Sequence, residues 1–210
     1  MKLERAGRSM PSGKTLTVAL TGVSGAILTR ELLLLLEQDA RVERVHFIAS
    51  ESSLRVLAEE LEISGRKDMV AKLLGQTSDK IIQHAPGDIG APIASGSCPC
   101  DGMIILPCSM GTLGAIANGL ADNLIARAAD VCLKERRPLL LGVRETPFNK
   151  IHLRNMQLAA DAGATIFPVI PVFYNRPTGT LEMARQYVCR VLAHLGLPQD
   201  SAYQWTGKSK

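Results

Sequence analysis

The sequence predicts a single α/β domain with a doubly wound parallel sheet and helices on both faces. Apolar runs of strand length alternate with longer segments of helical periodicity, which is the pattern of βαβ units. Apolar residues make up 46% of the 210 residues, enough for one substantial core. No internal repeat, linker or shift in composition marks a second domain. We therefore expect one sheet whose crossovers are right-handed.

The predicted elements follow one another along the whole chain. Apolar runs predict strands at 16–20, 45–49, 81–83, 103–106, 139–143 and 164–167. Helical periodicity predicts helices at 25–37, 53–61, 66–74, 111–118, 120–135, 151–162 and 181–195. Leu32, Leu33 and Leu36 share one face of the first helix and should enter the core, whereas Gly163 and Gly196 fit positions just after helix ends. This order is typical of Rossmann-like and flavodoxin-like folds.

The positive charge is concentrated at the two ends of the chain. The formal net charge is +4, but the first fourteen residues carry +3 and the last three carry +2, so the remainder sums to −1. With only 4% aromatic residues, the chain lacks the basic, base-stacking face of a nucleic-acid binder. We expect a flexible N-terminal tail at 1–14, a domain at 15–198 and a C-terminal tail at 199–210, with no nucleic-acid partner.

The sequence contains no clear secretory signal, transmembrane segment or metal-binding motif. The N-terminal charges precede no apolar core, and no run of about eighteen apolar residues could cross a bilayer, so we expect no membrane partner. Cysteines stand at 98, 100, 108, 132 and 189, and this odd number in apolar context suits a reduced cytoplasmic interior. The Cys98-Pro99-Cys100 pair lacks a second ligand pair, and the four histidines share no ligand-like spacing. We interpret all of them as structural.

Two glycine- and serine-containing turns follow predicted strands. The first, TGVSGA (21–26), offers the backbone N–H groups of a starting helix to an anion, with Gly22 and Ser24 in the turn. The second, PCSMGT (107–112), places Ser109 and Thr112 at a similar turn, and Ser50 follows the second strand. Together they suggest a phosphorylated mononucleotide, although simple helix capping by the serines stays open. The small-residue segment ASGS (94–97) could lie flat on a planar ligand or form a surface loop.

The candidate catalytic residues of the chain are a group of cationic side chains together with one carboxylic acid and one phenol. Arg144 and Glu145 follow the strand at 139–143, where a parallel sheet binds its ligands. Lys134, Tyr174 and Arg190 could join them to bind a phosphate, which arginine grips with two hydrogen bonds. Ordinary surface salt bridges are the alternative interpretation.

These segments together resemble the flavin prenyltransferase (UbiX-type) family of homo-oligomeric FMN-binding flavoproteins. The resemblance runs from about residue 16 to residue 198. Its carriers are TGVSGA (21–26), ASGS (94–97), PCSMGTL (107–113), NLIARAADVCLKERRPL (123–139), VRETP (143–147), IHLRNM (151–156) and FYNRP (173–177).

The resemblance implies an activity and its partners. Such enzymes join the prenyl group of a dimethylallyl phosphate to N5 and C6 of reduced FMN and close a fourth ring. The prenylated FMN then serves a UbiD-type decarboxylase. No metal is needed if the cations replace magnesium, and whether the donor is the monophosphate or the diphosphate stays open. The family also implies trimers of trimers or dodecamers with shared sites, so we expect a homododecamer in the cytoplasm.

The family motifs also imply residue roles in this chain. The implied FMN contacts are Gly22, Ser24, Ser50, Ser109, Thr112 and Arg144. The implied phosphate and catalytic group is Lys134, Arg144, Glu145, Tyr174 and Arg190. In these roles the cations and the phenol stabilise the departing phosphate, Glu145 moves a proton, and Ser24 lies near the reactive edge of the flavin. Some members carry an aromatic residue where this chain has Ile89, which leaves prenyl-chain selectivity open.

Other functions on the same frame are less well supported by the sequence. Cysteine decarboxylases of this group use an active-site histidine after the second strand and a segment like PASANT, where this chain has ASGS. A non-catalytic FMN-binding module would need none of Glu145, Tyr174 and Arg190. Direct decarboxylation of aromatic acids lacks an apparent electron sink.

Overall fold

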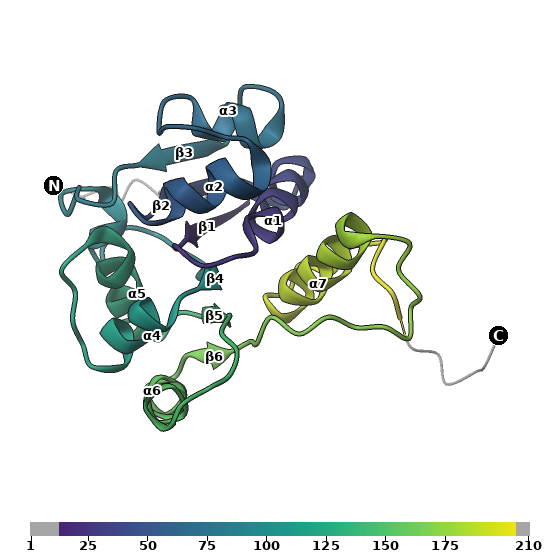
Figure 1. Cartoon of the computed structure of the whole chain (residues 1–210). Helices are drawn as coiled ribbons and strands as arrows, with labels where there is room; N and C mark the ends of the chain where they lie inside the picture. Colours follow the sequence, from purple (N-terminus) through teal and green to yellow (C-terminus); the bar gives the residue numbers. More distant parts are fainter. Residues whose placement is uncertain (1–12, 205–210) are drawn as a thin grey trace, which may run out of the picture.

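The computed structural model describes residues 13–204, which form one sheet flanked by helices (Figure 1). All strand pairs are parallel and the strand order is β3-β2-β1-β4-β5-β6. The strands are β1 (Lys14–Leu20), β2 (Val42–Ala49), β3 (Ile81–His84), β4 (Gly102–Cys108), β5 (Leu139–Val143) and β6 (Thr165–Ile166). The helices are α1 (Ala26–Gln38), α2 (Ser53–Leu61), α3 (Met69–Leu74), η1 (Pro92–Ala94), α4 (Met110–Ala117), α5 (Leu124–Lys134), α6 (Lys150–Asp161) and α7 (Thr180–His194). The predicted doubly wound parallel sheet is confirmed.

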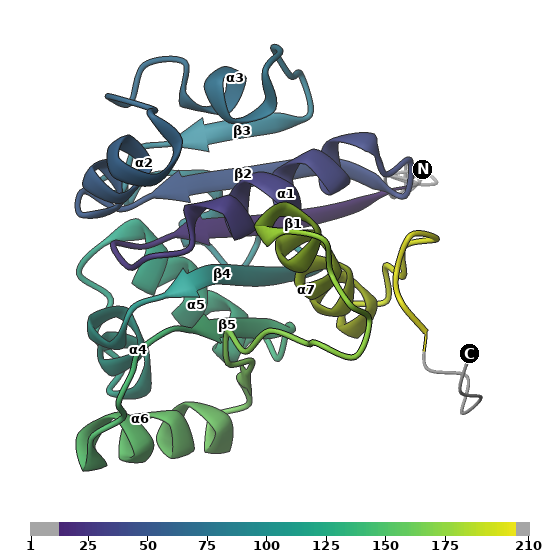
Figure 2. The same cartoon turned by 45° about the vertical axis from the view of Figure 1, so that its right-hand side comes forward.

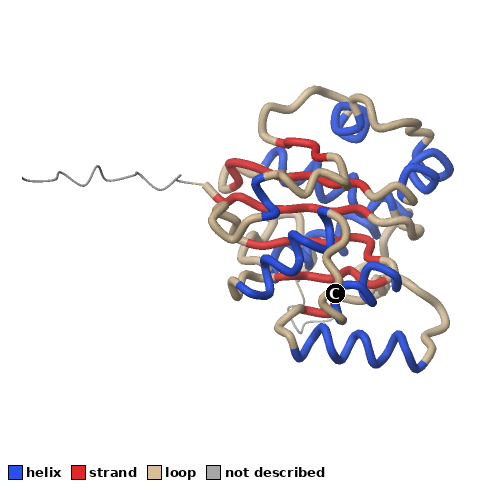
Figure 3. Tube along the Cα trace, turned by 90° about the vertical axis from the view of Figure 1, so that its left-hand side faces the viewer, coloured by secondary structure: helices blue, strands red, loops and turns tan. Residues whose placement is uncertain are grey.

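Two apolar cores lie on the two faces of the sheet, whose strands run side by side in Figure 3. Side chains alternate between them, as the pleat of a strand requires. In β1, Leu16, Val18 and Leu20 pack against α1 and α7, whereas Ala19 joins the opposite core. The first core also receives α2 and α3, and the second receives α4, α5 and α6, an arrangement visible in Figures 1 and 2. The predicted core face of α1 is confirmed, because Leu32, Leu33 and Leu36 are fully buried.

Most predicted boundaries differ from the structure by one to four residues, and three of the differences illustrate why. β2 begins three residues earlier than predicted, because Val42 is buried beside the end of α1. β4 continues through Pro107 to Cys108, and the register of its pairing with β5 shifts there, which is where a sheet tolerates proline. α5 begins only after Asn123, whose side chain accepts a hydrogen bond from the backbone of the first turn.

The ends of the chain are only partly described. Residues 1–12 and 205–210 lie outside the described residues, so the tails predicted at 1–14 and 199–210 stay predictions. Residues 199–204 do contact the domain, because Gln199 Nε2 donates to Asp39 Oδ2 at 3.0 Å and the Tyr203 N–H donates to Gln186 Oε1 at 2.8 Å. Across residues 13–204, no helix combines the length and apolar character needed to cross a bilayer.

The strand order reverses between β1 and β4. In open parallel sheets this reversal opens a crevice outside the carboxyl ends of the two strands, and ligands bind there. The loop 21–25 after β1 and the turn after β4 therefore border the expected binding crevice.

A buried histidine pair links β2 to β3. His46 Nδ1 lies 2.8 Å from His84 Nε2, and His46 is only 4% exposed. Burial, together with the nearby charges of His84 and Arg44, lowers the pKa of His46 from 6.5 to about 4, and burial also lowers the pKa of His84. Both rings therefore stay neutral in the folded protein at pH values where the unfolded chain binds protons.

This pair should make the protein less stable in mild acid. Between pH 6.5 and about 4 the unfolded state binds more protons at position 46, so stability falls as the pH falls through this window. Each pH unit inside it should lower the free energy of unfolding by up to about 1.4 kcal/mol. Urea denaturation at pH 7, 6 and 5 measures the slope. Replacing His46 and His84 together by phenylalanine should flatten it, whereas His194→Gln should not; an unchanged slope in the double variant contradicts the assignment.

Candidate active site at the carboxyl edge of the sheet

Loops after three strands meet at the carboxyl edge of the sheet. Thr21, the first residue after β1, donates its hydroxyl to the Pro107 carbonyl at 2.9 Å and accepts the Ser109 N–H at 2.8 Å, which joins the β1 loop to the β4 turn. Gly22 lies against Ser52 after β2, so closely that a Cβ would overlap the Ser52 side chain and lie 2.9 Å from its carbonyl carbon. The rim therefore has one fixed arrangement.

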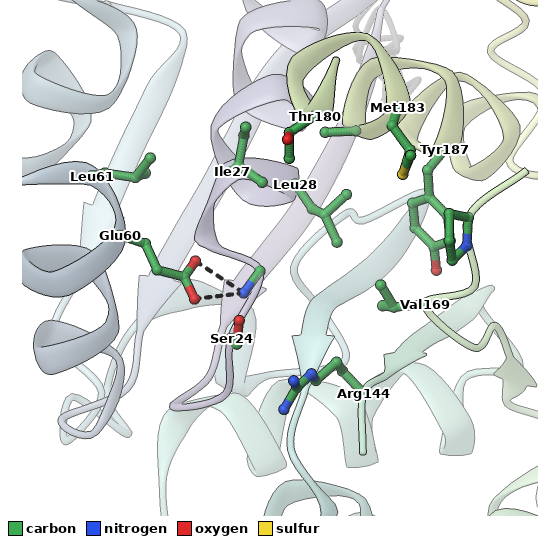
Figure 4. A pocket seen from close by; sticks show the side chains of 13 residues that line it. Ser24, Ile27, Leu28, Glu60, Leu61, Arg144, Val169, Thr180, Met183 and Tyr187 are labelled. Atoms are coloured by element: carbon green, nitrogen blue, oxygen red, sulfur yellow. Dashed lines mark hydrogen bonds between the residues drawn. The ribbon is translucent and has the colours of Figure 1, made fainter. Parts of the chain in front are cut away.

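The N-terminus of α1 already binds an anion, the carboxylate of Glu60. Both oxygens of Glu60 accept from the Gly25 N–H, at 3.1 and 3.0 Å (Figure 4). One of them also accepts from the Ala26 N–H at 2.8 Å. The sequence predicted that these N–H groups face a ligand or simply a cap. In this structure a side chain of α2 occupies the helix terminus and Ser24 makes no capping hydrogen bond, so the serine cap is absent and the ligand contacts of this turn stay a prediction.

A cavity of about 560 Å³ opens between α1 and α7, and we call it the α1–α7 cavity. Figure 4 shows Ser24 and Glu60 on one side, Met183, Tyr187 and Val169 on the other, and Arg144 at the polar end. Its remaining walls are mostly apolar. The full lining is Ser24, Gly25, Ile27, Leu28, Glu60, Leu61, Arg144, Val169, Pro171, Thr180, Met183, Ala184 and Tyr187. This size and this mixture of apolar walls with few polar groups are typical of small-molecule sites.

A second cavity, of about 470 Å³, lies beyond the ends of β2, β3 and β4, and we call it the β2–β4 cavity. Ser50 and Thr112 both line it, so the structure brings together two of the residues that the sequence assigned to one ligand. Asn123, which the sequence analysis did not assign to a ligand, lines it as well. The capping interpretation also holds, because Ser50 Oγ accepts the Ser53 N–H at 3.2 Å. Ser109 caps α4 by accepting the Thr112 N–H at 3.3 Å.

Tyr174 and Arg190 line a third and smaller cavity, of about 70 Å³. Met183 and Tyr187 of α7 line both this cavity and the α1–α7 cavity. The Tyr174 ring packs near that of Tyr203, with centroids 5.4 Å apart. The structure therefore places Tyr174 and Arg190 together, one cavity away from Arg144.

Glu145 stands beside Arg144 but outside the lining of these three cavities. Its Oε1 accepts the N–H of Thr146 at 3.0 Å, and the residue is half-buried. The carboxyl group is thus held close to the strand end that carries Arg144.

Lys134 lies at the opposite edge of the sheet from Arg144. α5 starts at the β2–β4 cavity, runs for eleven residues, and ends at Lys134 just before the amino end of β5, a length of about 16 Å. There Lys134 pairs with Glu135 and lies against Gly96, where a Cβ would come 2.6 Å from its Nζ. The prediction that Lys134 joins Arg144 is therefore wrong within one chain. The ASGS segment lies beside Lys134 rather than at the carboxyl edge.

Comparison with known proteins identifies the family. A family model described as Flavoprotein matches residues 4–193. A flavin prenyltransferase UbiX from Pseudomonas aeruginosa is 41% identical over 202 residues, which cover 93% of this chain and 96% of the relative. This chain belongs to the flavin prenyltransferase UbiX family. The predicted resemblance is confirmed.

Other UbiX proteins and UbiX-like structures also match this chain over nearly their whole length. The UbiX of Salmonella typhimurium is 44% identical over 196 residues, covering 92% of this chain and 99% of the relative. A crystal structure of AnUbiX (PadA1) with FMN and dimethylallyl pyrophosphate has a TM-score of 0.85 at 39% identity, covering 94% of this chain and all of that one. A dodecameric FMN-dependent UbiX-like decarboxylase from Escherichia coli O157:H7 has a TM-score of 0.84 at 40% identity, covering 92% of this chain and all of that one.

The cysteine decarboxylases are more distant from this UbiX-family chain. Peptidyl-cysteine decarboxylase EpiD has a TM-score of 0.55 at 20% identity, covering 84% of this chain and 98% of that one. At this identity the likeness shows a shared fold alone. It gives no support to the alternative that this chain decarboxylates cysteine peptides.

Two residues of the site were missed by reasoning from the sequence. Glu60 sits on a helix whose pattern indicates only an amphipathic surface element, and its hydrogen bonds reach residues 35 positions away. Tyr187 lies inside α7, where its hydroxyl reaches the carbonyl oxygens of Phe167 at 3.0 Å and Pro168 at 3.2 Å. It thereby anchors the start of the segment that carries Tyr174. No local signal marks either residue, because each contact depends on the packing of distant elements.

Proposed function

We propose that this protein transfers a dimethylallyl group from dimethylallyl phosphate to N5 and C6 of reduced FMN, producing prenylated FMN. The observation that carries the proposal, beside family membership, is the α1–α7 cavity. Its polar end holds the Arg144 guanidinium, and its other walls are mostly apolar apart from Ser24, Glu60 and Thr180. A donor with a phosphate at one end and a five-carbon apolar group at the other matches this division.

The donor set of the rim is compatible with FMN. Ser50 and Thr112 offer hydroxyl groups in the β2–β4 cavity, next to the start of α4, where phosphate and ribityl oxygens would be bound. The loop that carries Gly22 and Ser24 lies between the ends of β2 and β4, and Ser24 and Arg144 line the adjoining α1–α7 cavity, so these residues would hold the rest of the cofactor. When bound, reduced FMN supplies the nucleophilic ring atoms of the reaction.

The cations of the chain would stabilise the phosphate as its bond to carbon breaks. Negative charge grows on the departing oxygen, and the Arg144 guanidinium at the polar end of the cavity would stabilise that charge through hydrogen bonds. Arg144 is in place for this role, and Tyr174 and Arg190 would bind the phosphate from the adjoining smaller cavity, which shares Met183 and Tyr187 with the α1–α7 cavity. Glu145 would then give a proton to the departing phosphate.

Lys134 would act from a second copy of the chain. Because it lies at the amino edge with the ASGS segment, it can meet Arg144 only across a subunit boundary. A homododecamer would supply such a boundary, and the UbiX-like neighbour described above is dodecameric. We further propose that the assembly works in the cytoplasm, needs no metal ion, and passes prenylated FMN to a UbiD-type decarboxylase.

The proposal is tested by anaerobic incubation with reduced FMN and dimethylallyl phosphate or the diphosphate. Mass spectrometry of the extracted flavin should show the gain of one five-carbon prenyl unit with at least one donor. A flavin of unchanged mass with both donors, from protein that still binds FMN, defeats the proposed reaction.

Glu145→Gln should separate binding from chemistry. The amide keeps the size of the side chain but cannot deliver a carboxylic proton, so product formation should slow by about 100-fold while FMN binding is retained. Flavin fluorescence measures binding and product mass measures turnover. Glu59→Gln, which removes an exposed carboxylate that pairs with Arg55 on α2, is the control and should turn over normally. Normal turnover by Glu145→Gln removes this residue from its role.

A further inference from the structure

One face of α7 lines the small cavity that also contains Tyr174. Four residues with the i, i+3, i+4, i+7 spacing of a single helix face line this cavity, namely Met183, Gln186, Tyr187 and Arg190. The function proposed above uses Arg190 of this face and gives Gln186 no role. Gln186 is half-buried and brings a polar amide to the cavity wall, so its hydrogen-bond partners indicate what it does there.

The Gln186 amide holds the C-terminal segment 199–204 against α7. The chain turns after the helix at Gly196, where φ is +74°, and returns to α7. Gln186 Nε2 donates to the Ser201 carbonyl at 3.0 Å, and Gln186 Oε1 accepts the Tyr203 N–H at 2.8 Å. One partner needs a donor and the other an acceptor, so together they fix the orientation of the amide. One side chain thereby holds the backbone of the segment at two points.

The beginning of the same segment is fixed near the turn between α1 and β2. Gln199 Nε2 donates to Asp39 Oδ2 at 3.0 Å, and the Arg41 guanidinium donates to the Pro198 carbonyl at 2.9 Å. The segment is therefore attached on both sides of residue 200. Each attachment reduces the conformational freedom of the segment before any ligand binds. Ala202 and Tyr203, which line the small cavity, are consequently held at a fixed place in its wall.

Tyr203 brings this fixed segment into contact with Tyr174. The two ring centroids are 5.4 Å apart and the ring planes differ by 51°, a tilted arrangement in the distance range of favourable aromatic pairs. Tyr174 lies in the connection 167–179, which contains no helix or strand, and it is 63% exposed. Its ring is therefore positioned by neighbours at the surface, and Tyr203 is one of them.

We propose that Gln186 is a positioning residue for the prenyl donor and acts through Tyr203 and Tyr174. In this role Gln186 touches neither FMN nor the donor. It fixes Tyr203, whose ring supports the Tyr174 ring in the cavity that Arg190 also lines. The Tyr174 hydroxyl and Arg190 then meet the donor phosphate in place, so less ordering is needed when the donor binds. The inference rests on the proposed function, which assigns the phosphate to this cavity.

Gln186→Met tests this role, because it keeps the length of the side chain and removes both hydrogen bonds. The KM for the dimethylallyl donor should rise by about fivefold or more, while the Kd for FMN should change by less than about twofold. Tyr203→Ala should have the same effect, whereas Tyr203→Phe, which keeps the ring, should not. Arg185→Gln, an exposed position on α7, is the matched control and should behave as wild type. An unchanged donor KM in Gln186→Met overturns the proposal.

A double-variant cycle distinguishes action through Tyr174 from a general loss of structure. In a Tyr174→Ala background, Gln186→Met should raise the donor KM no further, because the group that Gln186 positions is absent. A rise in that background as large as in the wild-type background contradicts the proposal.

Hydrogen exchange of the FMN-loaded protein, read by mass spectrometry, measures the positioning without turnover. Gln186→Met should speed exchange in peptides covering 199–204 and also in those covering 172–177, where the Arg176 N–H is hydrogen-bonded. Faster exchange in 199–204 alone contradicts the support of Tyr174. Wild-type protein that transfers no prenyl group contradicts the proposed function instead, and the exchange result still supports or contradicts the positioning.

Discussion

Lys134→Ala and Arg144→Ala will each abolish most prenyl transfer, and assemblies containing both variant chains will recover part of it. In one chain these residues lie at opposite edges of the sheet, so the site proposed above would take Lys134 from one copy and Arg144 from another. Removing one stabilising donor from such a site costs about 100-fold in rate or more. In a mixed assembly, some sites combine the intact Arg144 of a Lys134→Ala chain with the intact Lys134 of an Arg144→Ala chain. Co-expression with two affinity tags, followed by mass analysis of the flavin, measures the recovery.

A control assembly of two other variants tests whether the recovery comes from sites shared between chains rather than from mixing variant chains in general. Ser24 and Arg144 line the same cavity of one chain, so assemblies of Ser24→Ala with Arg144→Ala should show no recovery beyond the activity of the Ser24→Ala sites. Size-exclusion chromatography confirms that both mixtures assemble equally. If intact assemblies of Lys134→Ala with Arg144→Ala are no more active than assemblies of either variant alone, Lys134 of one chain and Arg144 of another do not meet in one site.

Gly22→Ala will destabilise the protein and greatly weaken FMN binding. A Cβ at this position would overlap the Ser52 side chain and lie 2.9 Å from the backbone carbonyl carbon of Ser52, which cannot rotate away. Forcing an extra methyl group into packed structure costs about 1–3 kcal/mol. Here the strain falls between the loops after β1 and β2, so both cavities beside the rim should be distorted. Thermal denaturation and flavin titration measure the two effects, and we expect FMN affinity to fall by at least about tenfold.

Gly87→Ala is the matched control for this change. Gly87 lines the β2–β4 cavity as well, but nothing lies within 4 Å of a Cβ there, so stability should be nearly unchanged. Adding Ser52→Gly to Gly22→Ala removes the overlapping side chain and should restore part of the stability. If Gly22→Ala is as stable as Gly87→Ala, the contact with Ser52 does not fix the rim.

Local patterns predicted most of the fold because each element bears its own signal. The alternation in β1 and the leucine face of α1 are properties of neighbouring residues, and burial followed them. The limits of β4 and α5 were less predictable, since a shift in strand pairing and the cap at Asn123 decide where they end or begin.

The site was predictable only where topology alone fixes position. Residues that follow parallel strands share one edge of the sheet, which is why Ser50 and Thr112 meet in one cavity. Lys134 ends a helix that precedes a strand, and a helix that crosses over a parallel sheet ends at the amino edge. The role that the family resemblance implies for Lys134 therefore does not place it beside Arg144 within one chain. Glu60 could not be found from the sequence, because its partners on α1 become neighbours only after α1 and α2 pack together.

The carboxylate of Glu60 makes the charge of the α1–α7 cavity asymmetric, with a negative group at α1 and a positive group at Arg144. The wall at α1 presents oxygen atoms where the first turn of a helix ordinarily presents exposed N–H groups, while the opposite, polar end presents the Arg144 guanidinium. A phosphate in this cavity is repelled by the carboxylate and attracted by the guanidinium, which favours a donor molecule with its charged end toward Arg144. The Glu60 carboxylate also acts as the counterion of the first turn of α1 in the absence of a ligand.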